Sequence, residues 1–176
     1  GNTVIRENHV GDWGTPFGML IERLEDLESE GVQPSDALAD LGIFYRDARS
    51  SFDSDENFRE RARGRVVALQ SGDEATMVRW RQLVDLSFSY FDEVYDLLGV
   101  LLTKDDVRGE SFYDPLLASV VERLDERGLL SNNSGAEVMY PGDWLNREGN
   151  PLPLIIRKGD GGYNYATSDL ACIIDR

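Results

Sequence analysis

A phenol and a carboxylate lie four residues apart near the carboxyl end of this chain. Tyr165 is near the end of a predicted strand, and Asp169 is in the first turn of the helix predicted to follow. This junction places both side chains at the carboxyl edge of a sheet, where ligands of α/β folds bind. The pair suits a guanidinium or ammonium group, because charged hydrogen bonds to a planar fork are strong. The alternative, favoured from these residues alone, is that Asp169 only complements the helix dipole.

A glycine-rich turn at residues 8–14 is the second candidate site, and it lies between a predicted strand and a predicted helix. Gly11 would let a backbone approach a ligand closely, while His9 and Asp12 supply polar groups. The turn lacks the glycine spacing of phosphate-binding loops, so no phosphate site is predicted. The alternative is a tight turn with Trp13 as a core anchor, and residue type alone favours it.

The chain offers no further set of catalytic residues. One histidine and one cysteine, Cys172, exclude an intramolecular disulfide and most zinc sites. No serine nucleophile motif accompanies the histidine. We therefore predict no catalytic residue and no metal ligand in the chain, and we expect Cys172 to be a small buried apolar residue.

Six arginines form the only basic cluster in the sequence. A spacing of two residues scatters their side chains around a helix, because it does not follow the helical period. Contact with a phosphate backbone is one interpretation, and a solvated helix face is the preferred one. The cluster consists of Arg59, Arg61, Arg63, Arg65, Arg79 and Arg81.

The composition is that of a folded chain with a large acidic excess. Its 176 residues are 41% hydrophobic, enough for a real core in one domain or in one domain with a small satellite. No apolar run reaches the ~20 residues that span a bilayer, and no signal peptide opens the chain, so a cytoplasmic protein without a membrane partner is expected. A net charge of −15 by itself argues against non-specific nucleic-acid binding.

The first half of the chain is predicted to hold the glycine-rich turn between a short strand and several helices. Residues 3–7 are β-branched and read as a strand, and Thr15 is expected to cap the next helix with Pro16 at its first position. Apolar residues at helical spacing then predict helices capped by Ser35 and Asp53, and a long helix that begins at residue 77 and, with Gly99, ends near residues 100–102.

The second half is predicted to alternate between helix and strand. A helix over 115–127 is followed by a loop at 131–135, and residues 136–140 and 152–158 are strand-like. A turn at 158–162 leads to a strand over 163–167 and to a helix capped by Ser168. This order of elements predicts an α/β fold that is interrupted by largely helical insertions and is incomplete at both ends.

Several ordered blocks resemble arginyl-tRNA synthetase, a class I aminoacyl-tRNA synthetase. The resemblance covers essentially the whole chain, and its first and last blocks are the most specific. In order, the blocks are NHVGDWGT at 8–15, FGML at 17–20, FDSDE at 52–56, LQSGD at 69–73, ESFY at 110–113, GA at 135–136 and RKGDGGYNYATSDLA at 157–171.

The resemblance implies a Rossmann-type catalytic domain interrupted by largely helical insertions. Residues 1–20 would form the strand, turn and helix of its first half, and residues 21–76 a helical insertion. Residues 77–105 would form a long helix associated with the Rossmann domain, and residues 106–153 a second, mixed α/β insertion. Residues 154–176 would supply strands and a helix start of the second half, with the arginine-binding motif.

The resemblance also implies an activity and its partners. Enzymes of this family use ATP and Mg²⁺ to convert L-arginine into arginyl-adenylate, and then transfer arginine to the 3′ end of its tRNA. Carried over residue by residue, Tyr165 and Asp169 are the arginine-binding pair, and this reverses the preference for a dipole role of Asp169. A buried carboxylate left unpaired by the wrong amino acid would provide the specificity.

The glycine-rich turn receives a weaker assignment from the same resemblance. His9, Gly11, Asp12 and Trp13 would form a floor of the active site that approaches the terminal adenosine of the tRNA. The acidic charge is then compatible with a tRNA enzyme whose basic surfaces lie in other segments. Pro16 departs from the family pattern, which usually has glutamine there.

The family's ATP motifs are expected outside these residues. His-x-Gly-His would precede Gly1, and the Lys-Met-Ser-Lys-Ser-type loop would follow Arg176. We therefore expect a central piece of the enzyme that alone does not aminoacylate and holds no ATP or Mg²⁺. The alternative is a free-standing synthetase-like module that binds arginine or a protein partner without catalysis. Open sheet edges would favour self-association of either form.

Overall fold

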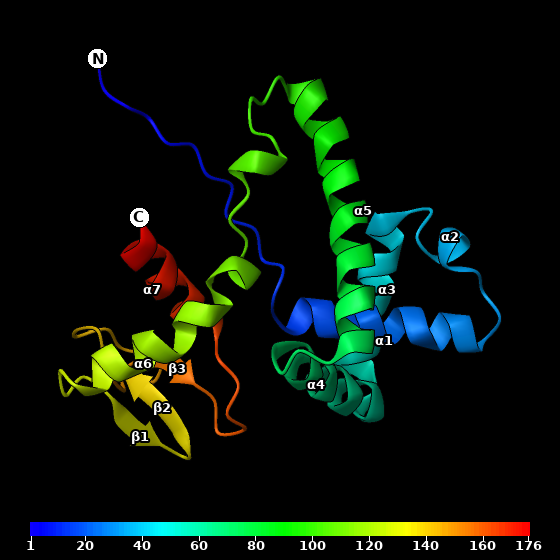
Figure 1. Cartoon of the computed structure of the whole chain (residues 1–176). Coiled ribbons are helices and arrows are strands. Elements are labelled where there is room, and N and C mark those ends of the chain that lie inside the picture. The colour runs from blue at the N-terminus through cyan, green and yellow to red at the C-terminus, as the bar shows by residue number, and fades with distance from the viewer. The chain divides into compact units, whose positions relative to one another are not determined.

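The computed structural model describes residues 1–176, which divide into two compact units, residues 1–109 and residues 110–176. The chain is mostly helical and contains one small antiparallel sheet (Figure 1). None of its helices combines the length and the apolar character needed to span a membrane.

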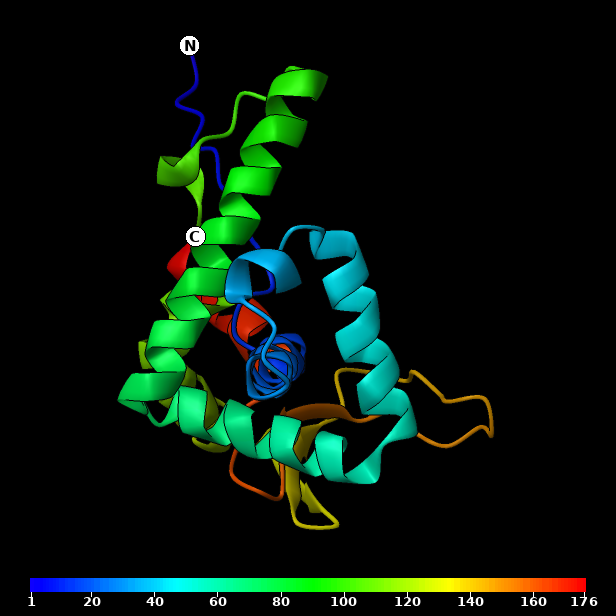
Figure 2. The same cartoon turned by 90° about the vertical axis from the view of Figure 1, so that its right-hand side faces the viewer.

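α1 (Thr15–Ser29) is the central helix of the first unit. Figure 2 shows it almost end-on, with other helices of the same unit around it. The other elements of this unit are α2 (Pro34–Ala37), α3 (Leu41–Ser54), α4 (Glu56–Gln70), α5 (Glu74–Leu98) and the 3-10 turn η1 (Lys104–Asp106).

The central position of α1 follows from its apolar spacing. Phe17, Leu20, Ile21 and Leu24 recur at intervals of three and four, and each is no more than 4% exposed. Helices α3, α4 and α5 supply the residues that cover them, so one core holds the four helices together. The covering residues are Phe44, Ala48, Phe58, Ala62, Leu69 and Leu83.

Aspartates begin three of these helices. The side chain of Asp40 accepts the backbone N–H of Ile43, that of Asp55 accepts two N–H groups of the first turn of α4, and that of Asp73 accepts the N–H of Thr76. At the other end of α5, Gly99 takes a positive φ of 67°, a conformation that favours glycine. The sequence therefore sets the ends of α3, α4 and α5 locally.

The second unit packs three helical segments beside a three-stranded sheet. Its elements are η2 (Glu110–Leu116), α6 (Leu117–Asp125), β1 (Ser131–Asn133), β2 (Ala136–Met139), β3 (Leu154–Arg157) and α7 (Tyr165–Asp175). The strand order is β1-β2-β3, and both pairs are antiparallel. Tyr113, Leu117, Val120, Ala171 and Cys172 form the helical core, so Cys172 is a buried free cysteine as predicted.

Two of the strands predicted from β-branched and aromatic residues do not form. Residues 3–7 are irregular, and Val4 and Ile5 are 79% and 82% exposed. In this segment only Asn8 pairs with another strand-like residue, Val107, so no strand forms. Residues 163–167 are not a strand either. The side chain of Asn164 accepts the N–H of Tyr165 at 3.0 Å and starts α7 four residues earlier than a Ser168 cap predicts.

Other local predictions are corrected by one or a few residues. Residues 131–133, expected in a loop, form β1 because they pair with β2 across a turn at Ser134-Gly135. Gly14 precedes α1 in the place expected for Thr15. Asp55 rather than Asp53 caps α4, and the helix expected from Ser35 breaks into α2 and α3. The strands over 136–140 and 152–158 are confirmed as β2 and β3.

Candidate functional site

The glycine-rich turn of the first unit is held from two sides. The backbone N–H of Asn8 donates to the carbonyl of Asp106 (2.7 Å), and the N–H of Arg108 donates to the carbonyl of Asn8 (3.0 Å). These two bonds make a parallel bridge between Asn8 and Val107. From α5, the hydroxyl of Tyr95 accepts a hydrogen bond from the side-chain amide of Asn8 at 2.9 Å. The start of the turn is therefore fixed by both α5 and the segment that follows it.

The segment that holds Asn8 is itself ordered by a capping box. The backbone N–H and the hydroxyl of Thr103 both donate to Asp106, at 2.8 and 3.0 Å. The backbone hydrogen bond from Thr103 is the main reason that the pKa of Asp106 lies below its usual value. An ionised Asp106 thus keeps the backbone of residues 106–108 in place for pairing with Asn8.

His9 and Gly11 lie on the exposed side of this turn. The Nδ1 atom of His9 is 3.0 Å from the carbonyl oxygen of Arg108. A carbonyl only accepts, so Nδ1 carries the proton in this contact, and Nε2 is the nitrogen with a lone pair in the neutral ring. Gly11 is exposed and lines a pocket described below.

Asp12 and Trp13 point into the structure and are 7% and 8% exposed. The backbone carbonyl of Asp12 accepts a hydrogen bond from the indole N–H of Trp80 at 2.6 Å, and the two indole rings meet edge to face at 5.3 Å. A Cβ at Gly109 would lie 2.6 Å from the Asp12 carboxylate, so only glycine fits over that carboxylate. Trp13 is part of the core, and it is not an exposed contact residue.

A pocket opens beside the turn, and we call it the α3–α5 groove. Its inner part, of about 70 Å³, is lined by Val10, Gly11, Asp12, Phe17, Tyr45, Val84, Ser87, Phe88 and Phe91. Its outer part, of about 240 Å³, is lined by Leu41, Gly42, Tyr45, Ser87, Tyr90 and Phe91. In the sequence, the only indication of this groove was a set of aromatic residues at helical spacing. That spacing is equally typical of a buried core, so the groove could not be predicted from it.

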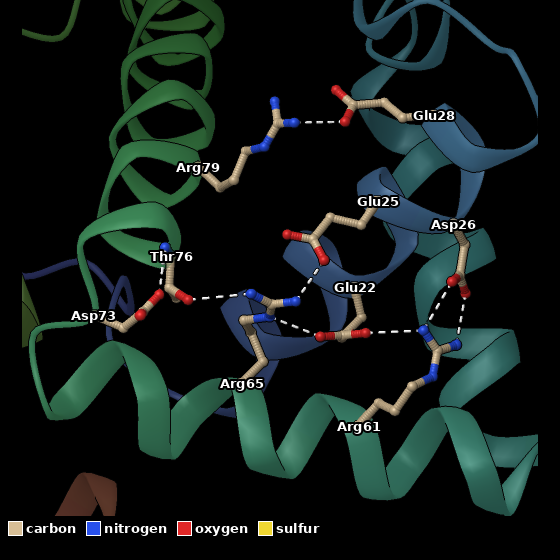
Figure 3. A network of polar contacts seen from close by, with 9 residues as sticks. All are labelled: Glu22, Glu25, Asp26, Glu28, Arg61, Arg65, Asp73, Thr76 and Arg79. Atoms are coloured by element: carbon tan, nitrogen blue, oxygen red, sulfur yellow. Dashed lines mark hydrogen bonds and ion pairs between the residues drawn. The ribbon is translucent and has the colours of Figure 1, made fainter.

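An ion-pair network fixes the helix that follows the turn (Figure 3). The carboxylate of Glu22 on α1 lies between two arginines of α4, 2.9 Å from Arg61 and 2.6 Å from Arg65. Arg61 also makes two hydrogen bonds of 2.8 Å to Asp26, and these are the main reason that the pKa of Asp26 is lowered. Arg65 reaches the hydroxyl of Thr76 on α5 at 3.1 Å as well.

This network changes the interpretation of the basic cluster. Arg61 and Arg65, together with Arg79, which pairs with Glu28, neutralise the acidic side of α1. Three members of the cluster therefore hold α1 against α4 and α5, which is neither of the two roles considered from the sequence. Arg63 and Arg81 remain on the exposed surface.

Tyr165 and Asp169 lie on α7 of the second unit. Tyr165 is the first residue of this helix rather than the end of a strand, and Asp169 is in its second turn. Residues four apart on a helix are neighbours on one face, with about 5–6 Å between their Cβ atoms. Both are on the exposed surface, and Tyr165 is 64% exposed. The helix thus brings the two together without the strand–helix junction predicted for them.

The buried side of α7 anchors this pair. The hydroxyl of Thr167 donates to the carbonyl of Ile156 on β3 at 2.5 Å, and both residues are fully buried. Ala166, Thr167 and Ser168 are small, so the helix packs closely on the sheet. A phenolic hydroxyl and a carboxylate presented on a rigid helix can together bind a cationic planar group.

Neither unit arranges residues for metal binding. No group of three or more histidine, cysteine, aspartate or glutamate side chains is placed to hold a metal ion. The two candidate sets lie in different units, the turn in residues 1–109 and the tyrosine–aspartate pair in residues 110–176.

Comparison with known proteins gives one consistent result. A family model described as the catalytic domain of class I tRNA synthetases (R) matches residues 1–176. The arginine–tRNA ligase of Shewanella woodyi is 55% identical over 174 residues, and that of Thermobifida fusca is 51% identical over 173. Each alignment covers 98% of this chain but only 30% of the relative.

A solved structure agrees with this comparison. The crystal structure of arginyl-tRNA synthetase from Plasmodium falciparum matches with a TM-score of 0.66 and 31% identity, over 96% of this chain and 27% of that one. The chain thus spans less than a third of the length of the relatives it matches. Since the family model matches every residue, the chain belongs to the class I tRNA synthetase (R) family and corresponds to part of its catalytic domain.

Proposed function

We propose that this chain is part of an arginine–tRNA ligase, which activates L-arginine with ATP and transfers it to its tRNA. The observation that carries the proposal is the match of the catalytic-domain family model to residues 1–176, together with relatives named arginine–tRNA ligase at more than half identity. Such chemistry depends mainly on positioning and on charge stabilisation rather than on a protein nucleophile. The absence of a serine–histidine–acid set from the sequence fits that requirement.

Within this function, we assign arginine binding to Tyr165 and Asp169. Their four-residue spacing on α7 gives a carboxylate for the guanidinium and a phenolic hydroxyl beside it. Anchoring of the opposite helix face by Thr167 supports the assignment, because a rigid pair discriminates better than a mobile one. For the turn, the exposed positions His9 and Gly11 are the better candidates for contact with the tRNA 3′ end.

The proposed Rossmann-type sheet rests on a smaller observation. Asn8 and Val107 form one parallel bridge, and parallel strands are the basis of such sheets. We propose that residues 3–8 extend this bridge into a strand when neighbouring strands of the complete protein are present. Their exposed β-branched side chains, Val4 and Ile5, would then be buried.

ATP and Mg²⁺ are assigned to other parts of the complete enzyme. The sequence of this chain contains no phosphate-loop pattern, and the family's ATP motifs are expected in other segments. We further propose a cytoplasmic location, in which the one buried cysteine stays reduced, and association through open strand edges.

Arginine-dependent ATP–pyrophosphate exchange tests the proposed function. In the complete protein that contains these residues, exchange is expected, whereas the 176-residue chain alone is expected to show none. Asp169→Asn in the complete protein should raise KM for arginine much more than KM for ATP, while Asp175→Asn on the same helix should change neither. Equal increases in KM for arginine and for ATP would contradict the assignment of Asp169 to arginine binding.

The same proteins distinguish an arginine–tRNA ligase from the alternative, a module that binds arginine without catalysis. Calorimetric titration of arginine into the 176-residue chain, with and without Asp169→Asn, measures binding directly. Arginine binding by a complete protein that shows no exchange would favour the module, and exchange by that protein would exclude it.

A further inference from the structure

Hydrogen bonds at the end of β3 hold the first turn of α7. The backbone carbonyl of Ile156 accepts the hydroxyl of Thr167 at 2.5 Å and the backbone N–H of Asn164 at 3.5 Å. The carbonyl of Asn164 accepts the N–H of Thr167 at 2.9 Å, and the side chain of Asn164 accepts the N–H of Tyr165 at 3.0 Å. We call the set of Ile156, Asn164 and Thr167 the β3–α7 clamp. It ties the start of the helix directly to the sheet.

The centre of the clamp is closed to water. Thr167 and Ile156 are both 0% exposed, and Ala166 and Ser168 beside Thr167 are buried as well. Without the Thr167 hydroxyl, the carbonyl of Ile156 would keep only the longer hydrogen bond from Asn164. A buried carbonyl that loses its donor is costly, because no water takes the donor's place. The hydroxyl therefore holds the first turn of α7 in one position on β3.

The second half of α7 is held in a different way. Ala171 and Cys172, one turn beyond Thr167, belong to the helical core that the second unit builds with η2 and α6. These apolar contacts do not depend on the clamp. Loss of the Thr167 hydroxyl would therefore loosen the first turn of the helix, while Ala171 and Cys172 keep the rest of it packed.

Tyr165 and Asp169 lie on the side of α7 that faces away from the clamp. With 3.6 residues per turn, each of them is about 160° around the helix from Thr167. Both are exposed, whereas Thr167 is buried, so a ligand bound to the pair would not touch Thr167. Tyr165 is the first residue of α7, and helix ends are where fraying occurs. The clamp thus supports the pair from behind, at the turn that needs it most.

We propose that Thr167 is a positioning residue for arginine recognition, which acts through the β3–α7 clamp on Tyr165 and Asp169. This role rests on the arginine-binding function proposed above for that pair. A planar guanidinium must meet the phenolic hydroxyl and the carboxylate in one geometry, because hydrogen bonds weaken steeply when they bend. When the Thr167 hydroxyl is lost, the first turn of α7 shifts on β3, so arginine binding weakens and ATP binding does not.

Arginine-dependent ATP–pyrophosphate exchange by the complete protein tests this role. Thr167→Val keeps the branched shape of the side chain but cannot donate a hydrogen bond. It should raise KM for arginine about tenfold and leave KM for ATP unchanged, because small misplacements of binding groups cost this much. Thr167→Ser keeps the hydroxyl and loses a buried methyl group, so it should lower thermal stability but retain the KM for arginine of the parent.

Two further variants separate positioning from stability. Cys172→Ala removes a buried side chain from the core of the same helix, so it should lower the melting temperature without changing KM for arginine. Asn164→Ala removes the acceptor for the N–H of Tyr165 at a partly buried position, and it serves as the second clamp variant if Thr167→Val does not fold. Asn164→Ala should raise KM for arginine, and Asn164→Asp, which keeps the acceptor, should restore it.

The outcomes distinguish this role from the proposed function itself. If Asp169→Asn raises KM for arginine but Thr167→Val does not, or if Thr167→Ser raises it as much as Thr167→Val, the positioning role is refuted and the arginine site stands. If Thr167 acts through the pair, Thr167→Val combined with Tyr165→Phe should raise KM by less than the product of the two single effects. A complete protein that shows neither exchange nor calorimetric binding of arginine would overturn the proposed function and the role of Thr167 together.

Discussion

At Gly18, α1 and α4 approach each other closely, and replacing this glycine with alanine gives a sharp test of the packing. A Cβ at Gly18 would lie 2.4 Å from the carbonyl oxygen of Ala62 and 2.6 Å from Cγ2 of Val66. A backbone oxygen in a helix cannot move aside by rotation, so the two helices must separate. Because α1 continues directly from the glycine-rich turn, this displacement would also reach residues 8–14.

Two opposing effects set the magnitude for Gly18→Ala. Alanine is favoured over glycine within a helix by up to about 1 kcal/mol. Overpacking a close helix contact costs about 1–3 kcal/mol, and a clash with rigid backbone belongs at the upper end. We therefore expect a net destabilisation of about 1–2 kcal/mol.

Gly64 on α4 is the matched control for this substitution. It is exposed, and a Cβ there would meet nothing within 4 Å, so only the helix propensity changes. Gly64→Ala should stabilise the first unit by up to about 1 kcal/mol, so the two variants should shift stability in opposite directions and differ by about 1–3 kcal/mol.

Urea unfolding followed by tryptophan fluorescence measures this difference. Trp13 and Trp80 report on the first unit, and the third tryptophan, Trp144, is removed by Trp144→Phe in every protein compared. If Gly18→Ala were as stable as its parent, or if both variants moved in the same direction, the close approach of α1 and α4 would be refuted.

Four further predictions follow from single contacts. Glu22→Gln should destabilise the protein by about 1–3 kcal/mol in urea unfolding, because two arginines lose a buried carboxylate, whereas exposed Glu56→Gln should change it by less than about 0.5 kcal/mol. Hydrogen bonds from Arg61 lower the pKa of Asp26, so the ion pair stabilises the folded protein above about pH 4. That stability is lost as the pH falls through the folded-state pKa of Asp26. Asp26→Asn should therefore reduce the difference between the urea midpoints measured at about pH 7 and at about pH 3. Asp55→Ala should cost about 1 kcal/mol in thermal unfolding through loss of the α4 cap, while Asp55→Asn should recover most of it. In calorimetric titration of the complete protein with arginine, Asp169→Asn should weaken binding at least about tenfold, and an unchanged affinity would contradict its role.

Helix ends and helix faces in this chain were accessible from the sequence because they depend on near neighbours. The spacing of Phe17, Leu20, Ile21 and Leu24 predicted the buried face of α1. The end of α5 was expected near residues 100–102 and lies at Leu98, just before Gly99. One aspartate cap was expected in the right region but displaced by two residues, from Asp53 to Asp55, since several acidic residues nearby can accept the same N–H groups.

Strands were less accessible, because a strand forms only when a partner lies beside it. Val4 and Ile5 have the residue types of a strand but no neighbour in this chain, whereas Ser131–Asn133, with polar residue types, form β1 against β2. Tyr165 was placed on a strand by the same residue-type argument, and Asn164 instead begins a helix there.

The sequence by itself determined the family and the buried face of α1. These depend on ordered motifs and on local periodicity, both of which can be recognised in the linear sequence. The tertiary structure alone decided that Arg61, Arg65 and Arg79 bind the carboxylates of α1, and that aromatic residues of α3 and α5 leave a groove open between them. Those outcomes depend on which helix faces meet, and residues as far apart as Glu28 and Arg79 meet only when the chain folds back on itself.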